Sequence, residues 1–389
     1  MPNNDQTAHG ILNGVRIVVV IGPFELGGAE RQALLLACHL VHEQKADLEV
    51  WGHGQPGRVS ELCDEQGIAW RSVPLPVPWS SRRSEQIKRL AIFARTLRRA
   101  RPDVILPFMF FQSVACGLVW RHTGARTCIW NQRDEGRDRL RYADRLAVRF
   151  TPRFVANSQN GAEFLINDLG VDPKRLTLIH NGVEITSGKW DRAKWRAHLG
   201  VSDEAFLACM VANLQQFKDH DTLLKAWRIV VDRLQSRGRE AVLLLAGRPE
   251  ETHLTLKALA FDLKLCNTVR FLGGVKDVRG LISAVDLGVH SSVNEGVPNG
   301  VLECMAAGLT VAGTDYLGIR EAVGPQGYEF LARPYDASAL ADQIIRLAVD
   351  PALRSNAGIA NRHRVENEFS PRKMYHEMTT VIREELHSK

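Results

Sequence analysis

Closely spaced cysteines are absent from this 389-residue sequence. The seven cysteines are odd in number, and neighbouring ones are at least twelve residues apart. This spacing supports neither a disulfide framework nor a zinc knuckle, so we expect free thiols, no bound metal and a reducing, cytoplasmic environment. The cysteines are Cys38, Cys63, Cys116, Cys128, Cys209, Cys266 and Cys304.

The sequence also lacks an export signal and an uninterrupted membrane span. Its start, MPNNDQTAHGILNG, is polar and has neither the basic beginning nor the apolar core of a signal peptide. One long apolar stretch, residues 104–120 (VILPFMFFQSVACGLVW), is interrupted by Pro107, Gln112 and Ser113. We interpret this stretch as a buried strand followed by a helix.

Neither of the common nucleotide-binding glycine fingerprints is present. The segment IGPFELGGAERQ, residues 21–32, follows the first expected strand, but its spacing is neither Gly-x-Gly-x-x-Gly nor Gly-Lys-Ser/Thr. A nicotinamide dehydrogenase is therefore disfavoured. Gly27 and Gly28 would still let backbone N–H groups approach a phosphate or sugar at the start of a helix. An ordinary tight turn between strand and helix explains the two glycines equally well.

Short aliphatic runs recur along the chain and alternate with helical patterns. Runs such as residues 15–22 (VRIVVVIG) and 241–247 (AVLLLAG) show no polar alternation, which is typical of parallel strands covered on both faces. Helical patterns such as residues 29–44 and 84–100 lie between the runs. The sequence therefore predicts an α/β fold built from doubly wound parallel sheets.

The length of the chain favours two domains rather than one, because a single core rarely serves so many residues. A polar stretch near residues 180–191 is the expected linker. We predict Rossmann-like domains at residues 1–184 and 185–370. Parallel sheets bind ligands at the carboxyl ends of their strands, so two such domains facing across a cleft would hold a ligand between them.

Three charged residues follow expected strands in the second domain. Lys218 precedes a helix, whose positive end repels it unless an anion is present. A solvent-exposed surface lysine is the simpler alternative. Glu295 precedes, and Glu303 lies within, a helix expected to begin at Pro298 and end at Gly308, in the stretch NEGVPNGVLECMAAG. Carboxylates in this position are good acceptors for the vicinal hydroxyls of a sugar.

Taken together, these motifs resemble the retaining, nucleotide-sugar-dependent glycosyltransferases of family 4, which have the GT-B fold. The resemblance spans nearly the whole chain, through GGAER, VANSQNGAEFLINDLGVDPKRLTLIHNGVE, KDHDTLLKAW, and the segment from VRFLGG to REAV. The family's acidic signature, two glutamates separated by seven residues, is matched by Glu295 and Glu303. A final helix at about residues 371–389 is expected to return to the N-terminal domain.

The resemblance implies roles for individual residues in binding the donor. Glu303 would bind the ribose hydroxyls, Glu295 the hydroxyls of the donor sugar, and Lys218 the diphosphate. Gly27 and Gly28 would border the same diphosphate. The backbone near the sugar and phosphates would come from Gly296, Val297, Pro298 and Asn299.

Two positions depart from the pattern of the family. Asn213 stands where relatives commonly have a second cationic residue, an arginine, so Arg31, Arg133 and Arg320 are candidates to replace it. A histidine that many relatives place near the reacting sugar is also missing, and the segment NQRDEGRD offers Arg133 and Asp134 instead.

The resemblance implies a retaining transfer from a nucleotide sugar, with UDP-sugars favoured over GDP-sugars, to a glycan or lipid-linked acceptor. Fixed cations and helix N-termini would stabilise the leaving diphosphate without a metal or other cofactor. The leaving phosphate would accept the acceptor's proton on the same face of the sugar. A double-displacement pathway with Glu295 and Glu303 as acid and nucleophile stays open but disfavoured.

The net charge of +6 is concentrated in residues 79–101, where eight basic residues accompany Trp79 and a single acidic residue, Glu85. This segment predicts either an anionic membrane surface as partner, at the inner face of the membrane, or a solvated helix face. Nucleic acid is a poor fit because aromatic residues are not interleaved. The basic residues are Arg82, Arg83, Lys88, Arg89, Arg95, Arg98, Arg99 and Arg101.

Two other functions remain compatible with the sequence. A nucleotide-sugar epimerase of the same fold would bind the donor without an acceptor. A non-catalytic nucleotide-sugar binding protein would explain the missing arginine and histidine.

Overall fold

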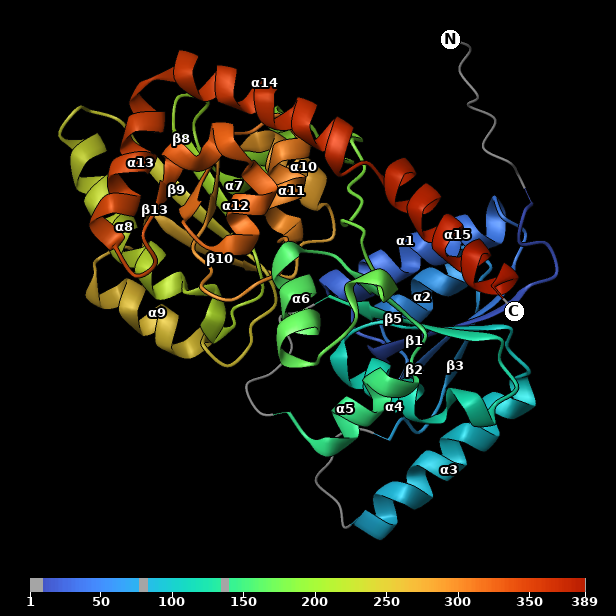
Figure 1. Ribbon diagram of the computed structural model, residues 1–389. Helices are drawn as coiled ribbons and strands as arrows, with labels where there is room; N and C mark the ends of the chain where they lie inside the picture. Colours follow the sequence, from blue (N-terminus) through green and yellow to red (C-terminus); the bar gives the residue numbers. More distant parts are fainter. Residues whose placement is uncertain (1–9, 77–82, 134–139, 389) are drawn as a thin grey trace. The chain divides into compact units, whose positions relative to one another are not determined.

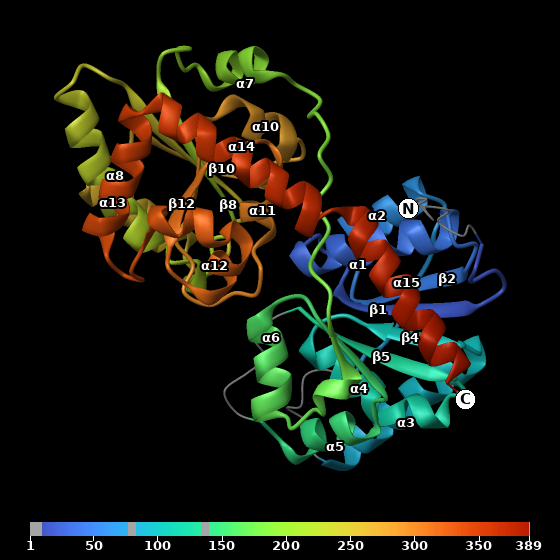
Figure 2. The same ribbon diagram turned by 45° about the horizontal axis from the view of Figure 1, so that its top comes forward.

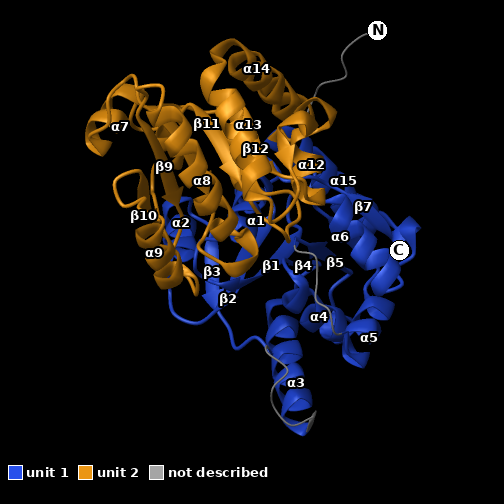
Figure 3. Ribbon diagram, turned by 90° about the vertical axis from the view of Figure 1, so that its left-hand side faces the viewer, with its two compact units in different colours: residues 1–182, 371–389 blue, residues 183–370 orange. Residues whose placement is uncertain are grey.

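The computed structural model describes residues 10–76, 83–133 and 140–388 and divides into two compact units. Unit 1 comprises residues 1–182 and 371–389, and unit 2 comprises residues 183–370 (Figure 3). The chain therefore leaves unit 1 after Gly182, near the expected boundary at residue 184, and re-enters it at Pro371.

Unit 1 is built on a seven-stranded parallel sheet in the order β3-β2-β1-β4-β5-β6-β7 (Figure 1). Its strands are β1 (Arg16–Pro23), β2 (Asp47–His53), β3 (Ala69–Ser72), β4 (Val104–Pro107), β5 (Thr127–Gln132), β6 (Arg153–Ala156) and β7 (Leu176–Leu178). Its helices are α1 (Gly28–His42), α2 (Arg58–Glu65), α3 (Arg83–Ala100), α4 (Phe110–Val119), α5 (Tyr142–Phe150), α6 (Gln159–Glu163), which continues as a π-helical turn over Phe164–Asp168, and α15 (Pro371–His387).

Side chains from both faces of this sheet are buried, as the continuous aliphatic runs predicted. On β1, Ile17 and Val19 pack in one core, whereas Val18 and Val20 pack in another on the opposite face. Alternate residues of a strand point to opposite faces, so an unbroken aliphatic run serves two helical layers. The stretch 104–120 forms β4 and then α4, as predicted.

Helix α15 packs beside α1 and completes one of these cores (Figure 2). Its side chains Met374, Met378, Val381 and Ile382 are buried in the same cluster as Val19. The two ends of the chain therefore share a hydrophobic core, as expected from the resemblance.

Unit 2 is built on a six-stranded parallel sheet in the order β10-β9-β8-β11-β12-β13. Its strands are β8 (Phe206–Val211), β9 (Ala241–Ala246), β10 (Val269–Gly273), β11 (Leu287–His290), β12 (Val311–Thr314) and β13 (Leu331–Ala332). Its helices are α7 (Arg192–Leu199), α8 (His220–Gln235), α9 (His253–Asp262), α10 (Val278–Ala284), α11 (Asn299–Ala306), α12 (Leu317–Val323), α13 (Ala337–Val349) and α14 (Pro351–Glu368). The prediction of doubly wound parallel sheets is thus confirmed in both units.

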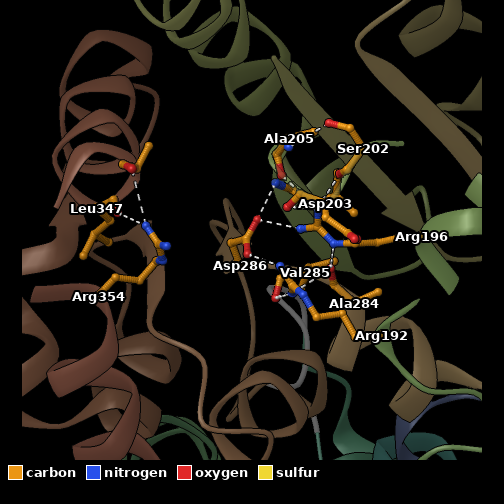
Figure 4. A network of polar contacts seen from close by, with 12 residues as sticks. Arg192, Arg196, Ser202, Asp203, Ala205, Ala284, Val285, Asp286, Leu347 and Arg354 are labelled. Atoms are coloured by element: carbon orange, nitrogen blue, oxygen red, sulfur yellow. Dashed lines mark hydrogen bonds and ion pairs between the residues drawn. The ribbon is translucent and has the colours of Figure 1, made fainter. Parts of the chain in front are cut away.

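A buried polar network joins α7 to the unit 2 sheet (Figure 4). Arg196 is 1% exposed, and its Nη2 donates to Asp286 Oδ2 at 2.9 Å. The remaining guanidinium nitrogens donate to the carbonyl oxygens of Ala284, Ser202, Asp203 and Ala205 at 2.7–3.1 Å. Every nitrogen of this buried cation is therefore hydrogen-bonded within the fold.

Helix α3 contains most of the described part of the basic segment, and Arg101 directly follows it; Trp79 and Arg82 lie outside the described residues. Phe93 and Leu97 face the core, whereas Lys88, Arg95 and Arg98 are exposed. Ile87 is 68% exposed and Ile92 40% exposed on the same helix. No helix within the described ranges is long and apolar enough to cross a membrane.

Candidate active site

The loops after β8 and β11 meet at the carboxyl edge of the unit 2 sheet. These strands are neighbours at the point where the strand order changes direction, which is where open α/β sheets bind ligands. Ser291 Oγ donates to the carbonyl oxygen of Lys218 at 3.0 Å, and the N–H of Val293 donates to the carbonyl oxygen of Phe217 at 2.9 Å. The two loops are thus fixed to each other.

Lys218 and Glu295 form a largely buried ion pair at this edge. Lys218 Nζ lies 2.5 Å from Glu295 Oε2, and the two side chains are 14% and 10% exposed. His290 Nε2 lies 2.7 Å from Glu295 Oε1, and Ser292 Oγ donates to the same oxygen. Both oxygens of the Glu295 carboxylate are therefore held by the surrounding protein.

These neighbours keep Glu295 ionised. Burial alone would raise the pKa of the Glu295 carboxyl, but Lys218 and His290 together hold that pKa well below its usual value. Conversely, burial lowers the pKa of the neighbouring His220 to about 3, and His290 and Lys218 add to the effect. His220 is therefore neutral at pH 7, and neither of its ring nitrogens has a hydrogen-bond partner among the described residues.

The loop after Glu295 leads directly into α11. Pro298 is the N-cap residue of this helix and supplies no side-chain hydrogen bond. Gly296, Val297 and Pro298 are buried, and Asn299 is the first, partly exposed, residue of the helix. A helix N-terminus presents donors and a positive dipole end to an anion.

Gly318 allows this loop to lie close to α12. A Cβ at Gly318 would stand 1.9 Å from the carbonyl oxygen of Gly296. Any larger residue would therefore displace the segment between Glu295 and α11.

Glu303 lies on α11, half-buried, beside the end of β8. Burial raises the pKa of the Cys209 thiol on β8 to about 12, and the nearby Glu303 carboxylate adds to this shift. Both glutamates are thus placed as expected, Glu295 in the loop and Glu303 within the helix.

Asn213 lies beside a cationic residue that sequence reasoning missed. Its Oδ1 accepts a hydrogen bond from the N–H of Arg248 at 3.0 Å, and the N–H of Leu214 donates to the carbonyl oxygen of Arg248 at 3.0 Å. Arg248 follows β9, and its side chain is 35% exposed. Its place in AGRPE, directly after an aliphatic strand, is the signal that could have identified it.

Of the three arginines expected to replace the missing cationic residue, Arg320 is committed elsewhere. Arg320 Nη1 lies 2.7 and 2.8 Å from the two oxygens of Asp315, and its guanidinium carbon lies 4.0 Å from the centre of the Tyr328 ring. Arg31 and Arg133 belong to unit 1.

The other predicted site residues also lie in unit 1. Gly27 is the N-cap residue of α1, and Gly28 is its first residue. Glu30, in the first turn, is close enough that a Cβ on Gly27 would stand 2.6 Å from its carboxylate. Asp134 lies outside the described residues.

Arg133 directly follows β5 and is 8% exposed. Its Nη1 donates to Asn181 Oδ1 at 2.8 Å, and its Nη2 lies 3.4 Å from Asn131 Oδ1. Asn157 Nδ2 also donates to Asn181 Oδ1, at 3.3 Å. The polar residues at the carboxyl edge of this sheet are thus connected through one amide oxygen.

Comparison with known proteins agrees with these arrangements. Residues 26–187 match the family described as Glycosyltransferase Family 4, and residues 191–364 match Glycosyl transferases group 1. Between them the two matches cover most of both units. The chain belongs to the family 4 glycosyltransferases.

Curated relatives match this family 4 chain over part of their length. The D-inositol 3-phosphate glycosyltransferase of Saccharomonospora viridis is 28% identical over 241 residues, 60% of this chain and 56% of the relative. The N-acetyl-alpha-D-glucosaminyl L-malate synthase of Bacillus anthracis is 27% identical over 209 residues, 54% of this chain and 53% of the relative. The chain therefore spans about half the length of the curated relatives it matches.

Solved structures show that this family 4 chain has the GT-B fold. The structure of Anabaena Alr3699/HepE in complex with UDP and glucose aligns with a TM-score of 0.81 at 20% identity, covering 95% of this chain and 99% of the other. The lipopolysaccharide-biosynthesis glycosyltransferase WaaG aligns with a TM-score of 0.71 at 16% identity, covering 95% and 99%.

A pocket of about 630 Å³ borders the site of this family 4 chain. Its walls include Phe217, Asp219, His220 and Val293, which flank the two fixed loops. Among the residues that the structure describes, no group of three or more His, Cys, Asp or Glu side chains is arranged to hold a metal ion.

Proposed function

We propose that this chain is a retaining glycosyltransferase that moves a sugar from a nucleotide-sugar donor to a hydroxyl of a glycan or lipid-linked acceptor. The observation that carries the proposal is the placement of Lys218 and the start of α11 around the switch point of the unit 2 sheet. A fixed cation and the N–H groups at a helix N-terminus are what a leaving diphosphate requires. Because these groups can supply the stabilising charge, the proposed transfer is independent of a metal.

Lys218 serves the transition state in this proposal. Its ammonium is positioned before the reaction by Glu295, which is itself fixed by His290 and Ser292. Preorganised charge of this kind stabilises a developing anion without further reorganisation. The resemblance assigned Glu295 to the hydroxyls of the donor sugar, and its present contacts support a second role, the positioning of Lys218.

Glu303 and Arg248 complete the proposed donor site. Glu303, on α11, would accept hydrogen bonds from the ribose hydroxyls. Arg248, beside Asn213, would supply the second cationic group that the arginine provides in relatives. UDP-sugars are the proposed donors, and the Anabaena structures that contain UDP and UDP-glucose support this choice.

The proposed sugar transfer follows from the positions of these groups. As the bond between the anomeric carbon and the phosphate oxygen breaks, negative charge grows on the diphosphate and positive charge on the sugar ring. The acceptor hydroxyl attacks the same face, and its proton passes to the departing phosphate oxygen. Arg133 and Asp134 take the place of the family's missing histidine near the reacting sugar in this proposal.

Steady-state kinetics of two variants test the proposal. Lys218→Ala should lower kcat by about 10²- to 10³-fold, as removal of a preorganised charge-stabilising donor does. Glu303→Ala should chiefly raise the KM for the donor, because its contact is made equally before and during the reaction. Assays should use UDP-, GDP- and ADP-sugars in parallel and contain a chelator.

Product analysis distinguishes the proposal from its alternatives. Wild-type kcat in Lys218→Ala would contradict the role of the lysine. A product in which the sugar changes while still attached to the nucleotide would identify an epimerase. Tight donor binding without transfer or hydrolysis would identify a binding protein.

We also propose that the exposed face of α3 contacts an anionic membrane surface. Exposed Lys88, Arg95 and Arg98 accompany the exposed apolar side chains of Ile87 and Ile92, and each basic residue near such a surface contributes about 1 kcal/mol. The protein should sediment with vesicles containing phosphatidylglycerol at low salt, and an Arg95→Gln/Arg98→Gln variant should sediment less. Equal sedimentation of both proteins would contradict the proposed membrane contact.

A further inference from the structure

The guanidinium of Arg133 is a buried cation whose partners in the described part of the chain are all neutral. Its two contacts are with the amide oxygens of Asn181 and Asn131, and its carbon lies 5.0 Å from the centre of the Phe108 ring. Within the described residues, no carboxylate contacts it, and its Nε has no hydrogen-bond partner.

Burial of such a charge is unfavourable. Transfer of a cation from water into a protein costs several kcal/mol unless an opposite charge compensates for it. Burial lowers the pKa of Arg133 to about 10, so the side chain still carries its charge at pH 7. Binding of an anion by such a buried, uncompensated cation is therefore strongly favourable.

A second unpaired atom lies beside the first. Asn157 is 2% exposed, and its Oδ1 has no hydrogen-bond partner among the described residues. Asn157 and Arg133 both donate to the same atom, Asn181 Oδ1, so the two side chains are adjacent. An unpaired cationic N–H next to an unpaired amide oxygen is complementary to an anion that also carries a hydroxyl group.

Two other arginines, the partly buried Arg175 and the buried Arg196, differ from Arg133 in this respect. In unit 1, Arg175 donates to the carbonyl oxygens of Pro152, Val148 and Thr151. In unit 2, Arg196 pairs with Asp286 and donates to four carbonyl oxygens. The partners of both arginines are explained by the fold, whereas those of Arg133 leave a donor and a charge unused.

We propose that Arg133 and Asn157 form a binding site for a phosphoryl or carboxylate group of a hydroxylated substrate, at the carboxyl edge of the unit 1 sheet. Arg133 Nε–H would donate to the anion, and Asn157 Oδ1 would accept from the neighbouring hydroxyl. The assignment of this anion to the acceptor rests on the proposed function. The binding of an anion by Arg133 does not.

Thermal unfolding of the full chain tests the site, with inorganic phosphate as the probe. The reference protein is Lys218→Ala, which weakens phosphate binding at the proposed donor site. Phosphate at roughly ten times its Kd, compared with chloride at equal ionic strength, should raise the midpoint by about 3–6 °C. Arg133→Met in this background should abolish the shift. Arg175→Met, which removes the same charge from the same unit, should retain it.

A second variant keeps the arginine and supplies the missing charge. Asn157→Asp would place a carboxylate next to Arg133, so it should raise the midpoint without phosphate and abolish the phosphate-induced rise. This variant is informative even if Arg133→Met fails to fold. An unchanged phosphate shift in both Arg133→Met and Asn157→Asp would overturn the proposed site.

The source of the anion is decided by UDP binding to the otherwise wild-type protein. If the anion belongs to the acceptor, UDP should bind Arg133→Met and wild type with the same Kd. A tenfold or larger loss of UDP affinity would assign Arg133 to the donor diphosphate instead and overturn the acceptor assignment. A phosphate shift that arises only after Asp134→Asn would show that the chain supplies its own counter-ion, which would also overturn the proposal. These binding measurements are independent of whether sugar transfer is observed.

Discussion

Arg133, in unit 1, directly follows strand β5, and Arg196, in unit 2, lies on helix α7. Both arginines are buried, but they are surrounded differently. Each guanidinium nitrogen of Arg196 donates either to the carboxylate of Asp286 or to main-chain carbonyl oxygens. Among the residues that the structure describes, Arg133 contacts only neutral amides, and its Nε is unpaired. Arg196 joins elements of the fold, whereas Arg133 retains binding capacity that the described fold does not use.

The comparison gives a criterion for separating structural from functional buried charges. A buried charge that is fully hydrogen-bonded within the fold is explained by stability. A buried charge with unpaired donors is more costly to retain and therefore indicates a ligand. Lys218 combines features of both cases. Its charged partner, Glu295, belongs to the fold, but both side chains lie at the carboxyl edge of the sheet, where ligands bind.

The largest expected effect comes from breaking the Arg196 network. Arg196→Met should lower the free energy of unfolding of unit 2 by about 3–5 kcal/mol, because the largely buried Asp286 carboxylate loses its buried cationic partner and keeps only the more exposed Arg192. Arg133→Met should leave the stability of unit 1 unchanged or increase it, since no carboxylate loses a partner. Urea denaturation of the two variants measures the difference directly.

Arg192 provides the matched control for this measurement. It pairs with the same Asp286 carboxylate at 2.8 Å, but its side chain is 44% exposed. Arg192→Ala should therefore cost no more than about 1 kcal/mol. If Arg192→Ala and Arg196→Met were equally destabilising, burial would not be the property that separates the two regions.

A smaller loss of stability is expected when protonation of His220 creates an uncompensated buried cation. The folded-state pKa of His220 is about 3 and its unfolded value is about 6.5. Between these values the unfolded chain binds a proton that the folded chain does not, so stability is present above pH 6.5 and is lost as the pH falls. The loss should approach about 1.4 kcal/mol per pH unit.

The measurement compares the pH dependence of unfolding in wild type and His220→Gln between pH 6.5 and pH 4.5. Glu295, whose lowered pKa makes its contribution to stability fall in the same direction at the lower end of this range, is present in both proteins, so the comparison isolates the contribution of His220. The variant should have the shallower slope by up to one proton. His363→Gln, a change at a histidine whose side chain is 71% exposed, is the control. Identical slopes for wild type and His220→Gln would show that His220 is charged in the folded protein.

Local signals in the sequence were sufficient to predict most of the fold. The aliphatic run at residues 15–22 became β1, Arg16–Pro23. The helix expected from Pro298 to Gly308 is α11, Asn299–Ala306, with Pro298 as its N-cap and Gly308 at φ +78° just beyond its end. These boundaries depend on backbone preferences of proline and glycine, which act over a few residues and are therefore visible in sequence.

The candidate site was predicted less completely, because its contacts join distant residues. Sequence placed Lys218 and Glu295 after neighbouring strands, but their ion pair spans 77 positions, 295 minus 218. The partners His290 and Ser292 became visible only when the loops after β8 and β11 were seen to be fixed together. Arg248 was missed for the same reason, since its contact with Asn213 crosses from β9 to β8.

Unit 1 is assembled from both ends of the chain, whereas unit 2 is a single continuous segment. During synthesis, therefore, all of unit 2 leaves the ribosome before α15 exists to cover the core around Val19. Until residues 371–389 emerge, the surface of unit 1 that α15 will cover has no native partner. Synthesis therefore begins with unit 1, but unit 1 completes its native core only after all of unit 2 has been made.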